Sequence, residues 1–252
     1  MDEMITVNNV SKNFISRGNS DTLALKGVSF SLEHGETLGI VGESGSGKST
    51  VAKLITGLIS PTKGEIRICD NDIQRQKGEN PLELYSKIQM VFQNPVESFN
   101  PRKTLGYSIG ESLRNRGFSA SAASTMVAEL LEKVGLTAEF ATKYPHQVSG
   151  GQCQRAAIAR ALAVEPNILV CDEATSALDV TVQKQIMELL DELRKTRDLS
   201  IIFICHNLAL VQSFCDRVIV LYDGVIVEQG RPNDIINNPQ AEYTKSLVDS
   251  IL

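Results

Sequence analysis

Residues Gly42–Ser49, with the sequence Gly-Glu-Ser-Gly-Ser-Gly-Lys-Ser, have the composition and spacing of a loop that holds phosphate groups. They fit the pattern G-x-x-x-x-G-K-[ST] in full, between an apolar run and a helical pattern. The glycines let the backbone bend and approach a ligand, so that successive N–H groups face an anion. Lys48 would contact the β- and γ-phosphates, and the Ser49 hydroxyl would coordinate Mg²⁺. The expected phosphate-binding residues are Gly42, Glu43, Ser44, Gly45, Ser46, Gly47, Lys48, Ser49 and Thr50.

Two adjacent acids stand at the end of an apolar run further along the chain. Asp172 and Glu173 follow Ile168–Cys171, a segment typical of a parallel strand that is covered on both faces. Asp172 would hold Mg²⁺ through water, and Glu173 would polarise the water that attacks the γ-phosphate. The alternative is a solvated acidic turn after a strand. The phosphate loop upstream favours the catalytic interpretation.

A histidine, His206, follows the next apolar run, which is expected to form a strand over Ser200–Cys205. Ligands of α/β sheets bind at the carboxyl ends of the strands. His206 would therefore hydrogen-bond a phosphate or hold the attacking water in place. The alternative is a core histidine whose hydrogen bonds are satisfied within the protein, and the sequence leaves that alternative open.

Bringing these residues together requires a sheet with flanking helices. Short apolar runs alternate with helical patterns, which predicts an α/β fold with a helical insertion at about residues 104–164, in one domain spanning residues 1–252. The expected strands are Ile5–Val10, Val28–Leu32, Thr37–Val41, Gly64–Ile68, Ile88–Phe92, Ile168–Cys171, Ser200–Cys205 and a hairpin of Arg217–Tyr222 with Val225–Gln229. The expected helices are Val51–Leu58, Ser124–Val134, Gly151–Val164, a segment around Val182–Leu193, and two short C-terminal segments.

Composition narrows the class of protein further. A net charge of −5 argues against a nucleic-acid partner. The cysteines show no CxxC spacing, so we expect reduced, buried thiols rather than a metal or redox site; they are Cys69, Cys153, Cys171, Cys205 and Cys215. The N-terminal residues lack the pattern of a secretory signal, and no apolar stretch approaches the about 18 residues of a spanning helix. Another component would have to hold this chain at a membrane.

Another glycine-containing segment, Val148-Ser-Gly-Gly-Gln152, lies between the phosphate loop and the two acids. With those motifs in this order, it resembles the signature motif of ABC-type ATPases. Ser149 would cap the following helix, and Gly150 and Gly151 would let the helix end approach a phosphate. The resemblance implies that Ser149–Gln152 contacts the γ-phosphate of ATP held by a second subunit. It also implies a dimer and the P-loop NTPase fold of ABC-ATPase type, with an antiparallel β subdomain and a helical subdomain.

Other positions resemble the same family one by one. Gln93 looks like the glutamine that ligates Mg²⁺ and acts as a coupling hinge. Asp179, in the segment Ser176–Asp179, looks like part of the loop that crosses the dimer interface. Phe14 occupies the place of the aromatic residue that stacks on adenine, with a core aromatic at a strand end as the alternative.

The resemblance implies roles for each group of residues, despite three departures from the family pattern. Val148, Cys153 and Asn207 stand where leucine, a polar residue and aspartate are usual, and none of these changes removes a catalytic group. The implied catalytic residues are Glu173, His206 and Gln93, and the implied metal ligands are Ser49, Gln93 and Asp172. The residues implied to bind nucleotide are those of the phosphate loop, Phe14, Ser149, Gly150, Gly151, Gln152 and Asp179.

The segment Gln93–Arg102, with the sequence Gln-Asn-Pro-Val-Glu-Ser-Phe-Asn-Pro-Arg, resembles the peptide/nickel class of import ATPases. The tail Asn238–Leu247 is similar to that class's Pro-x-x-x-Tyr-Thr-x-x-Leu pattern. Many peptide-importing members carry a longer C-terminal extension. This chain stops at Leu252, soon after Tyr243-Thr244, and in this it resembles the shorter ATPases of nickel and metallophore systems and some short dipeptide ones. The resemblance therefore implies uptake of oligopeptides, dipeptides, nickel or metal chelates, with the choice left open.

The class also implies partners and a location. ATP and Mg²⁺ are the expected cofactors, and the expected place is the periphery of the cell membrane on its cytoplasmic face. The expected partners are a second ABC ATPase subunit (a paralogue or a second copy), two transmembrane permease subunits and an extracytoplasmic substrate-binding protein. The alternatives are an exporter ATPase, a soluble ABC ATPase of translation or DNA repair, and a non-catalytic subunit. The segment around Asn100-Pro-Arg and the tail argue against the exporter.

Overall fold

The computed structural model describes residues 3–15, 21–175 and 178–250. The strands among these residues form two β-sheets. The antiparallel sheet contains β1 (Glu3–Phe14), β2 (Thr22–Glu33), β4 (Lys63–Ile68) and β5 (Asn71–Asp72), in the order β2-β1-β4-β5. The larger sheet contains β3 (Thr37–Val41), β6 (Ile88–Val91), β7 (Ile168–Asp172), β8 (Ser200–Ile204), β9 (Arg217–Tyr222) and β10 (Val225–Gly230). Its order is β10-β9-β3-β8-β7-β6, and only β10 runs antiparallel to its neighbour.

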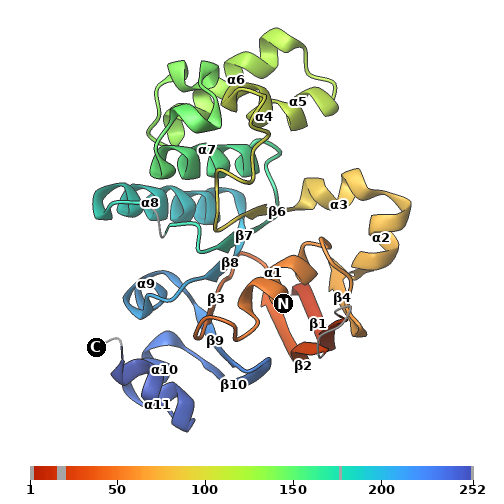
Figure 1. Ribbon diagram of the computed structural model, residues 1–252, viewed down its shortest axis with the longest axis vertical. Helices are drawn as coiled ribbons and strands as arrows, with labels where there is room; N and C mark the ends of the chain where they lie inside the picture. Colours follow the sequence, from red (N-terminus) through yellow and green to blue (C-terminus); the bar gives the residue numbers. More distant parts are fainter. Residues whose placement is uncertain (1–2, 16–20, 176–177, 251–252) are drawn as a thin grey trace.

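Helices flank the larger sheet and form a separate group at one end of the molecule (Figure 1). The helices of the core are α1 (Lys48–Ile55), α2 (Ile73–Glu79), α3 (Pro81–Lys87), α8 (Val180–Arg197), α9 (Leu208–Phe214), α10 (Pro232–Asn237) and α11 (Glu242–Asp249). The group at the end contains α4 (Leu105–Ile109), α5 (Glu111–Asn115), α6 (Ala120–Lys133) and α7 (Gly150–Leu162), with 3₁₀ segments at Ala138–Thr142 and Pro145–Gln147. None of the described helices has the length and apolar composition needed to cross a bilayer.

The expected α/β fold, with an antiparallel subdomain and a helical insertion, is confirmed. The insertion runs from α4 to α7 and lies far from the antiparallel sheet in Figure 1. That residues 1–252 form one domain stays a prediction.

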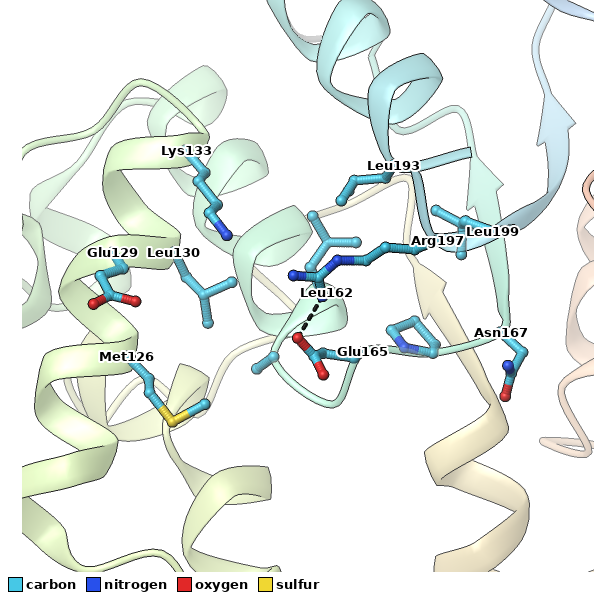
Figure 2. Close-up of a pocket in the computed structure, with 12 residues that line it drawn as sticks. Met126, Glu129, Leu130, Lys133, Leu162, Glu165, Asn167, Leu193, Arg197 and Leu199 are labelled. Atoms are coloured by element: carbon cyan, nitrogen blue, oxygen red, sulfur yellow. Dashed lines mark hydrogen bonds and ion pairs between the residues drawn. The ribbon is translucent and has the colours of Figure 1, made fainter. Parts of the chain in front are cut away.

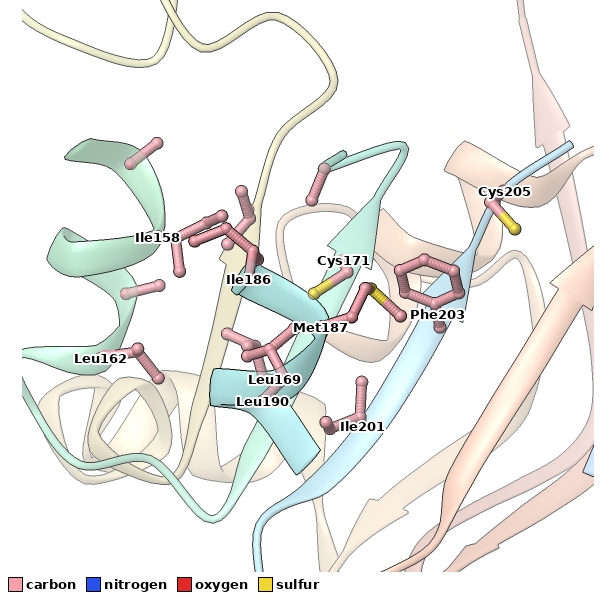
Figure 3. Close-up of a cluster of buried hydrophobic side chains, with 14 of the residues drawn as sticks. Ile158, Leu162, Leu169, Cys171, Ile186, Met187, Leu190, Ile201, Phe203 and Cys205 are labelled. Carbon is pink, nitrogen blue, oxygen red and sulfur yellow. The ribbon is translucent and has the colours of Figure 1, made fainter. Parts of the chain in front are cut away.

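The central strands are buried on both faces, which explains their continuous apolar sequences. Side chains alternate along each strand, so Leu169 and Phe203 face one cluster, and Val170 and Ile202 face the other. Figure 3 shows the first cluster, where residues of β7 and β8 point toward α7 and α8. The second cluster lies between the large sheet and the antiparallel sheet with α1. The two clusters fix the carboxyl ends of β3, β7 and β8 relative to one another.

The helix expected at Val51–Leu58 is α1, and it begins and ends earlier, at Lys48 and Ile55. Its first turn includes the end of the phosphate loop, because the Val51 N–H donates to Gly47 O at 2.9 Å. Its end is set by Gly57, whose φ of +69° is a left-handed conformation that favours glycine. Apolar periodicity places neither boundary, because the polar residues of the first turn carry no such signal.

The helices α2 and α3 were not predicted from the sequence. Both begin at capping residues: the Asp72 side chain accepts from Arg75 N at 2.8 Å, and the Asn80 side chain accepts from Glu83 N at 3.3 Å. Such caps are a sequence signal for a helix start, and Pro81 in the first turn adds to it. Each helix buries a single side chain, which is why apolar spacing gave no prediction there.

A cavity of about 520 Å³ lies where the helical insertion meets the core (Figure 2). Leu130 of α6, Leu162 of α7 and Leu193 of α8 form its apolar part. Arg197, at the end of α8, forms an ion pair with Glu165 in the segment that leads into β7. This ion pair is exposed, so it contributes about 1 kcal/mol or less to the contact between the two parts.

Four of the five cysteines are buried as expected, but Cys69 is only half-buried, so the expectation is wrong for that residue. Cys69 lies after β4 with a φ of +46°, in the turn that leads to β5 at the end of the antiparallel sheet. The chain therefore turns at the surface directly after Ile68, which is fully buried. Burial raises the pKa of Cys153 to about 11 and those of Cys171 and Cys205 to about 12.

Thiol labelling should separate Cys69 from the other cysteines. A maleimide at pH 8 is expected to label Cys69 first in the folded chain, because the reaction needs an accessible sulfur in its thiolate form. The remaining thiols are expected to react only on unfolding. Mass spectrometry of the labelled protein measures this, and Cys69→Ser should abolish the first label. Rapid labelling of Cys205 in the folded protein would contradict the prediction.

Candidate functional site

The phosphate loop connects β3 to α1 and needs glycine at two positions. A Cβ atom at Gly42 would lie 2.1 Å from the Leu221 carbonyl oxygen, and one at Gly47 would lie 2.8 Å from Ala24 O. Gly47 also has a φ of +109°. The loop is thus held close against the backbone of β9 and β2, and no side chain fits between them.

Lys48 is a buried cation whose partners are loop carbonyls. Its Nζ donates to Gly42 O and Glu43 O, each at 2.7 Å. Burial lowers the pKa of Lys48, and the nearby charges of Glu173 and Asp172 oppose that shift. The Ser46 hydroxyl in the same loop is buried and has no partner among the described residues. A buried ammonium group and a hydroxyl with unused bonding capacity fit an anionic polyphosphate.

Ser49 and Asp172 lie side by side, although they are far apart in sequence. The Ser49 hydroxyl donates to Asp172 Oδ1 at 3.2 Å. Burial raises the pKa of Asp172, and the Ser49 hydrogen bond opposes the shift. Oxygen ligands of this kind are the ones that Mg²⁺ prefers, so the two side chains fit the expected metal site.

Glu173 stands directly after β7 in a strained backbone conformation. Its φ is +50°, which is rare for a residue with a side chain, and such strain gathers at functional sites. Its N–H donates to Ile204 O at 3.0 Å, which joins the ends of β7 and β8. Gln93 Nε2 donates to Glu173 Oε2 at 2.5 Å. Gln93 and Glu173, expected to act together, are therefore in direct contact.

A cavity of about 460 Å³, which we call the loop cavity, lies beside the Gln93–Glu173 contact. Its lining includes the start of the phosphate loop together with Gln93, Glu173 and His206. His206 is exposed at this cavity, so the alternative of a buried core histidine is wrong. The structure thus gathers the three expected catalytic residues at the phosphate loop.

Ser149–Gln152 lies elsewhere, at the start of α7. The Ser149 hydroxyl accepts from Gln152 N at 3.3 Å, and Gln152 Oε1 accepts from Ser149 N at 2.9 Å. These reciprocal bonds form a capping box, as expected of the helix start. This segment and Asp179 line a second cavity of about 560 Å³, the signature cavity, which shares no residue with the loop cavity. Ser149–Gln152 therefore faces a different surface from the phosphate loop of its own chain.

Two further expected residues lie at the ends of secondary-structure elements. Phe14 lines neither cavity, whereas Asp179 lines the signature cavity. Phe14 ends β1 and is 42% exposed, so the alternative of a core aromatic is wrong. Lys12 Nζ lies 5.2 Å from the centre of the Phe14 ring. Asp179 caps α8 by accepting from Val182 N at 3.0 Å. Ser176, at the start of the same segment, lies outside the described residues.

The C-terminal segment also forms part of the site, which was not predicted from the sequence. Leu247 and Ser250 line the loop cavity, and the Tyr243 hydroxyl accepts from Glu43 N at 2.9 Å. Glu43 was expected among the phosphate-binding residues, but its N–H donates to Tyr243 instead. The tail had marked a subfamily only, and no pattern in the sequence relates residue 243 to residue 43.

Comparison with known proteins places this geometry among described families. The family model for ABC transporter matches residues 25–176. The chain is similar to the oligopeptide transport ATP-binding protein OppF of Salmonella typhimurium, with 45% identity over 90% of this chain and 69% of OppF. It is 46% identical to the dipeptide transport ATP-binding protein DppF of Haemophilus influenzae, over 90% of this chain and 70% of DppF.

A solved structure agrees with the fold. The dimeric post-hydrolysis state of the ATP-binding cassette MJ0796, bound to ADP and Pi, superposes with a TM-score of 0.85. The two sequences are 33% identical, and the match covers 91% of this chain and 99% of the cassette.

Proposed function

This chain belongs to the ABC transporter family, and we propose that it is the ATP-hydrolysing subunit of an importer for oligopeptides or dipeptides. The resemblance that the sequence analysis stated is thereby confirmed at the level of the family. The relatives described above are named for oligopeptide and dipeptide transport, which favours peptides over nickel or metal chelates. The observation that carries hydrolysis is the arrangement of side chains at one phosphate loop. Gln93 and Glu173 contact each other and line the loop cavity, and Lys48 bonds to two carbonyls of the loop.

Binding and chemistry divide among the residues of that set. Lys48 would exchange its two carbonyl partners for the β- and γ-phosphates of ATP. Ser49, Asp172 and Gln93 would hold Mg²⁺, which neutralises charge on the phosphate oxygens when it is bound. Glu173 would accept a hydrogen bond from the attacking water and then take a proton from it. The contact of Gln93 with Glu173 keeps the carboxylate oriented, and His206 at the edge of the cavity would hydrogen-bond the γ-phosphate.

The position of Ser149–Gln152 supports a composite site. The helix end carries a partial positive charge, and it lines a cavity that shares no residue with the loop cavity. We propose that it contacts the γ-phosphate at the loop of a second ATPase subunit, a paralogue or another copy of this chain. Asp179 would lie at the same interface, and Phe14 would stack on adenine at the chain's own loop.

The remaining partners follow from the importer assignment. A pair of transmembrane permease subunits would bind this chain at the cytoplasmic face of the membrane, near Gln93. An extracytoplasmic binding protein would select the substrate, because none of the motifs of this chain recognises a peptide. Nucleotide-driven closure of the two ATPase subunits would then be transmitted through the segment around Gln93.

Reconstitution tests the proposed function. The chain is co-purified with its permease subunits, its partner ATPase and its binding protein in lipid, and ATP hydrolysis is measured with added ligands. We expect oligopeptides or dipeptides to stimulate hydrolysis several-fold, because substrate loading favours the closed, hydrolysing state. Nickel ions and nickel chelates are expected to have no effect. Stimulation by nickel alone, with none by peptides, would contradict the assignment of substrate.

A further inference from the structure

The short helix α11 packs beside the phosphate loop and contacts it through one tyrosine. The Tyr243 hydroxyl accepts a hydrogen bond from the Glu43 backbone N–H at 2.9 Å. Glu43 is the second residue of the loop, and its carbonyl oxygen accepts from Lys48 Nζ at 2.7 Å. The Gly42–Glu43 peptide unit is therefore held by two bonds: its N–H donates to the C-terminal helix, and its carbonyl oxygen, Gly42 O, accepts from Lys48 Nζ at 2.7 Å.

The tyrosine ring has its own fixed position. It lies against Tyr222, the last residue of β9, with ring centres 4.1 Å apart and planes inclined by 31°. The preceding residue, Leu221, has the carbonyl oxygen against which Gly42 packs. The end of β9 thus contacts both the start of the phosphate loop, through Leu221, and the Tyr243 ring, through Tyr222.

The start of α11 is anchored independently of the loop. Glu228 in β10 accepts from Gln240 N at 2.9 Å and from Ala241 N at 3.0 Å. Those two N–H groups immediately precede the helix, so the carboxylate satisfies donors at a helix start. Two residues of α11, Thr244 and Leu247, are buried, and Leu247 lines the loop cavity. Tyr243 is therefore presented to the loop by a helix held on the sheet.

We propose that Tyr243 is a positioning residue for the phosphate loop, and that α11 thereby sets the affinity of this subunit for ATP. The inference rests on the proposed function, because it presumes that ATP binds at this loop. The Glu43 N–H is engaged by the hydroxyl and does not donate to a phosphate in this arrangement. Its bond instead holds the Gly42–Glu43 peptide unit, whose carbonyl oxygen, Gly42 O, is one of the two that Lys48 contacts. Loss of the hydroxyl would let this peptide rotate, and ATP binding would then have to order it.

Tyr243→Phe tests the role, because it removes the hydroxyl and keeps the ring. We expect the Kd for ATP to rise about three- to tenfold, the range of one neutral hydrogen bond, while kcat at saturating ATP stays within about twofold of its original value. The Glu43 amide should also exchange its hydrogen with solvent faster without nucleotide, as measured by hydrogen exchange. Tyr222→Phe is the matched control, since no hydrogen bond of the Tyr222 hydroxyl is found among the described residues.

The outcomes separate this inference from the proposed function. An unchanged Kd and an unchanged Glu43 exchange rate in Tyr243→Phe would overturn the positioning role, even if the original protein binds ATP. An equal loss of affinity in Tyr222→Phe would also overturn it, because removing a hydroxyl that does not bond to the loop would then have the same effect as removing the one that bonds to Glu43 N. Failure of the unaltered complex to bind ATP would instead contradict the proposed function. Weaker binding by Tyr243→Phe alone, with faster exchange at Glu43, supports the role.

Discussion

Glu173→Gln is expected to lower ATP hydrolysis at the loop of this subunit about 10²–10⁴-fold while ATP still binds. Glutamine keeps the size and the hydrogen-bonding oxygen of the side chain, but it does not accept a proton from water at neutral pH. The backbone strain at this residue and the ties to Ile204 and Gln93 remain, so the site is expected to keep its shape. Lys48 and Ser49, the proposed phosphate and Mg²⁺ contacts, are unchanged, so the Kd for ATP should change little.

Single-turnover hydrolysis and equilibrium ATP binding, measured on the co-purified complex, check this result. Glu79→Gln is a matched control, because it removes the same charge from an exposed residue of α2 that pairs only with Arg75 among the described contacts. That control should hydrolyse ATP at the original rate. Undiminished hydrolysis at the loop of the Glu173→Gln subunit would exclude Glu173 as the base. Loss of ATP binding in that variant would point to a structural role instead.

Gly150→Asp is expected to abolish hydrolysis at the loop of the partner subunit and to leave the folded subunit intact. A Cβ atom at Gly150 would meet nothing within 4 Å, so its own chain has room for the side chain. An acid in the first turn of α7 also interacts favourably with the helix dipole. Across a composite site, the same carboxylate would face the γ-phosphate and repel it. We expect a loss of at least about 10²-fold, the effect of losing one preorganised donor.

The matched control is Gly78→Asp in α2, where an added Cβ atom also meets nothing. It should leave ATP hydrolysis unchanged. The thermal stability of the Gly150→Asp subunit, measured without nucleotide, should equal or exceed that of the original chain. Combining the variants separates the two sites of an asymmetric pair, because Glu173→Gln acts on the chain's own loop and Gly150→Asp on the partner's. Normal hydrolysis with Gly150→Asp would contradict the composite site.

The phosphate loop and the two acids could be predicted from the sequence because their structure is local. An apolar strand, a glycine loop and a helix follow one another without interruption. The glycines, the lysine and the serine of this loop each have a specific role in the phosphate-binding pattern. The same holds for Ser149, whose capping bonds run to its own helix. The strands β3, β7 and β8 were also predictable, since burial on both faces requires continuous apolar sequence.

Boundaries and short helices were less predictable. The first turn of α1 is polar, and α2 and α3 each bury one side chain, so periodicity had little to detect. Cys69 has an apolar neighbour in sequence but lies in a surface turn. In each case, the packing of a few side chains or one backbone conformation determined the structure, and neither produces a periodic pattern in the sequence.

By itself, the sequence of this protein determined which residues carry charge, bend the backbone or cap a helix, and hence the chemistry of each motif. The tertiary structure alone decided which of them meet. It placed Ser49 against Asp172 and Gln93 against Glu173, and it turned Ser149–Gln152 to another surface. It also brought Tyr243 to the Glu43 N–H, although the two residues are 200 positions apart. Such contacts depend on how the strands are ordered in the sheet and on where the C-terminal helix packs, and no spacing within the chain encodes them.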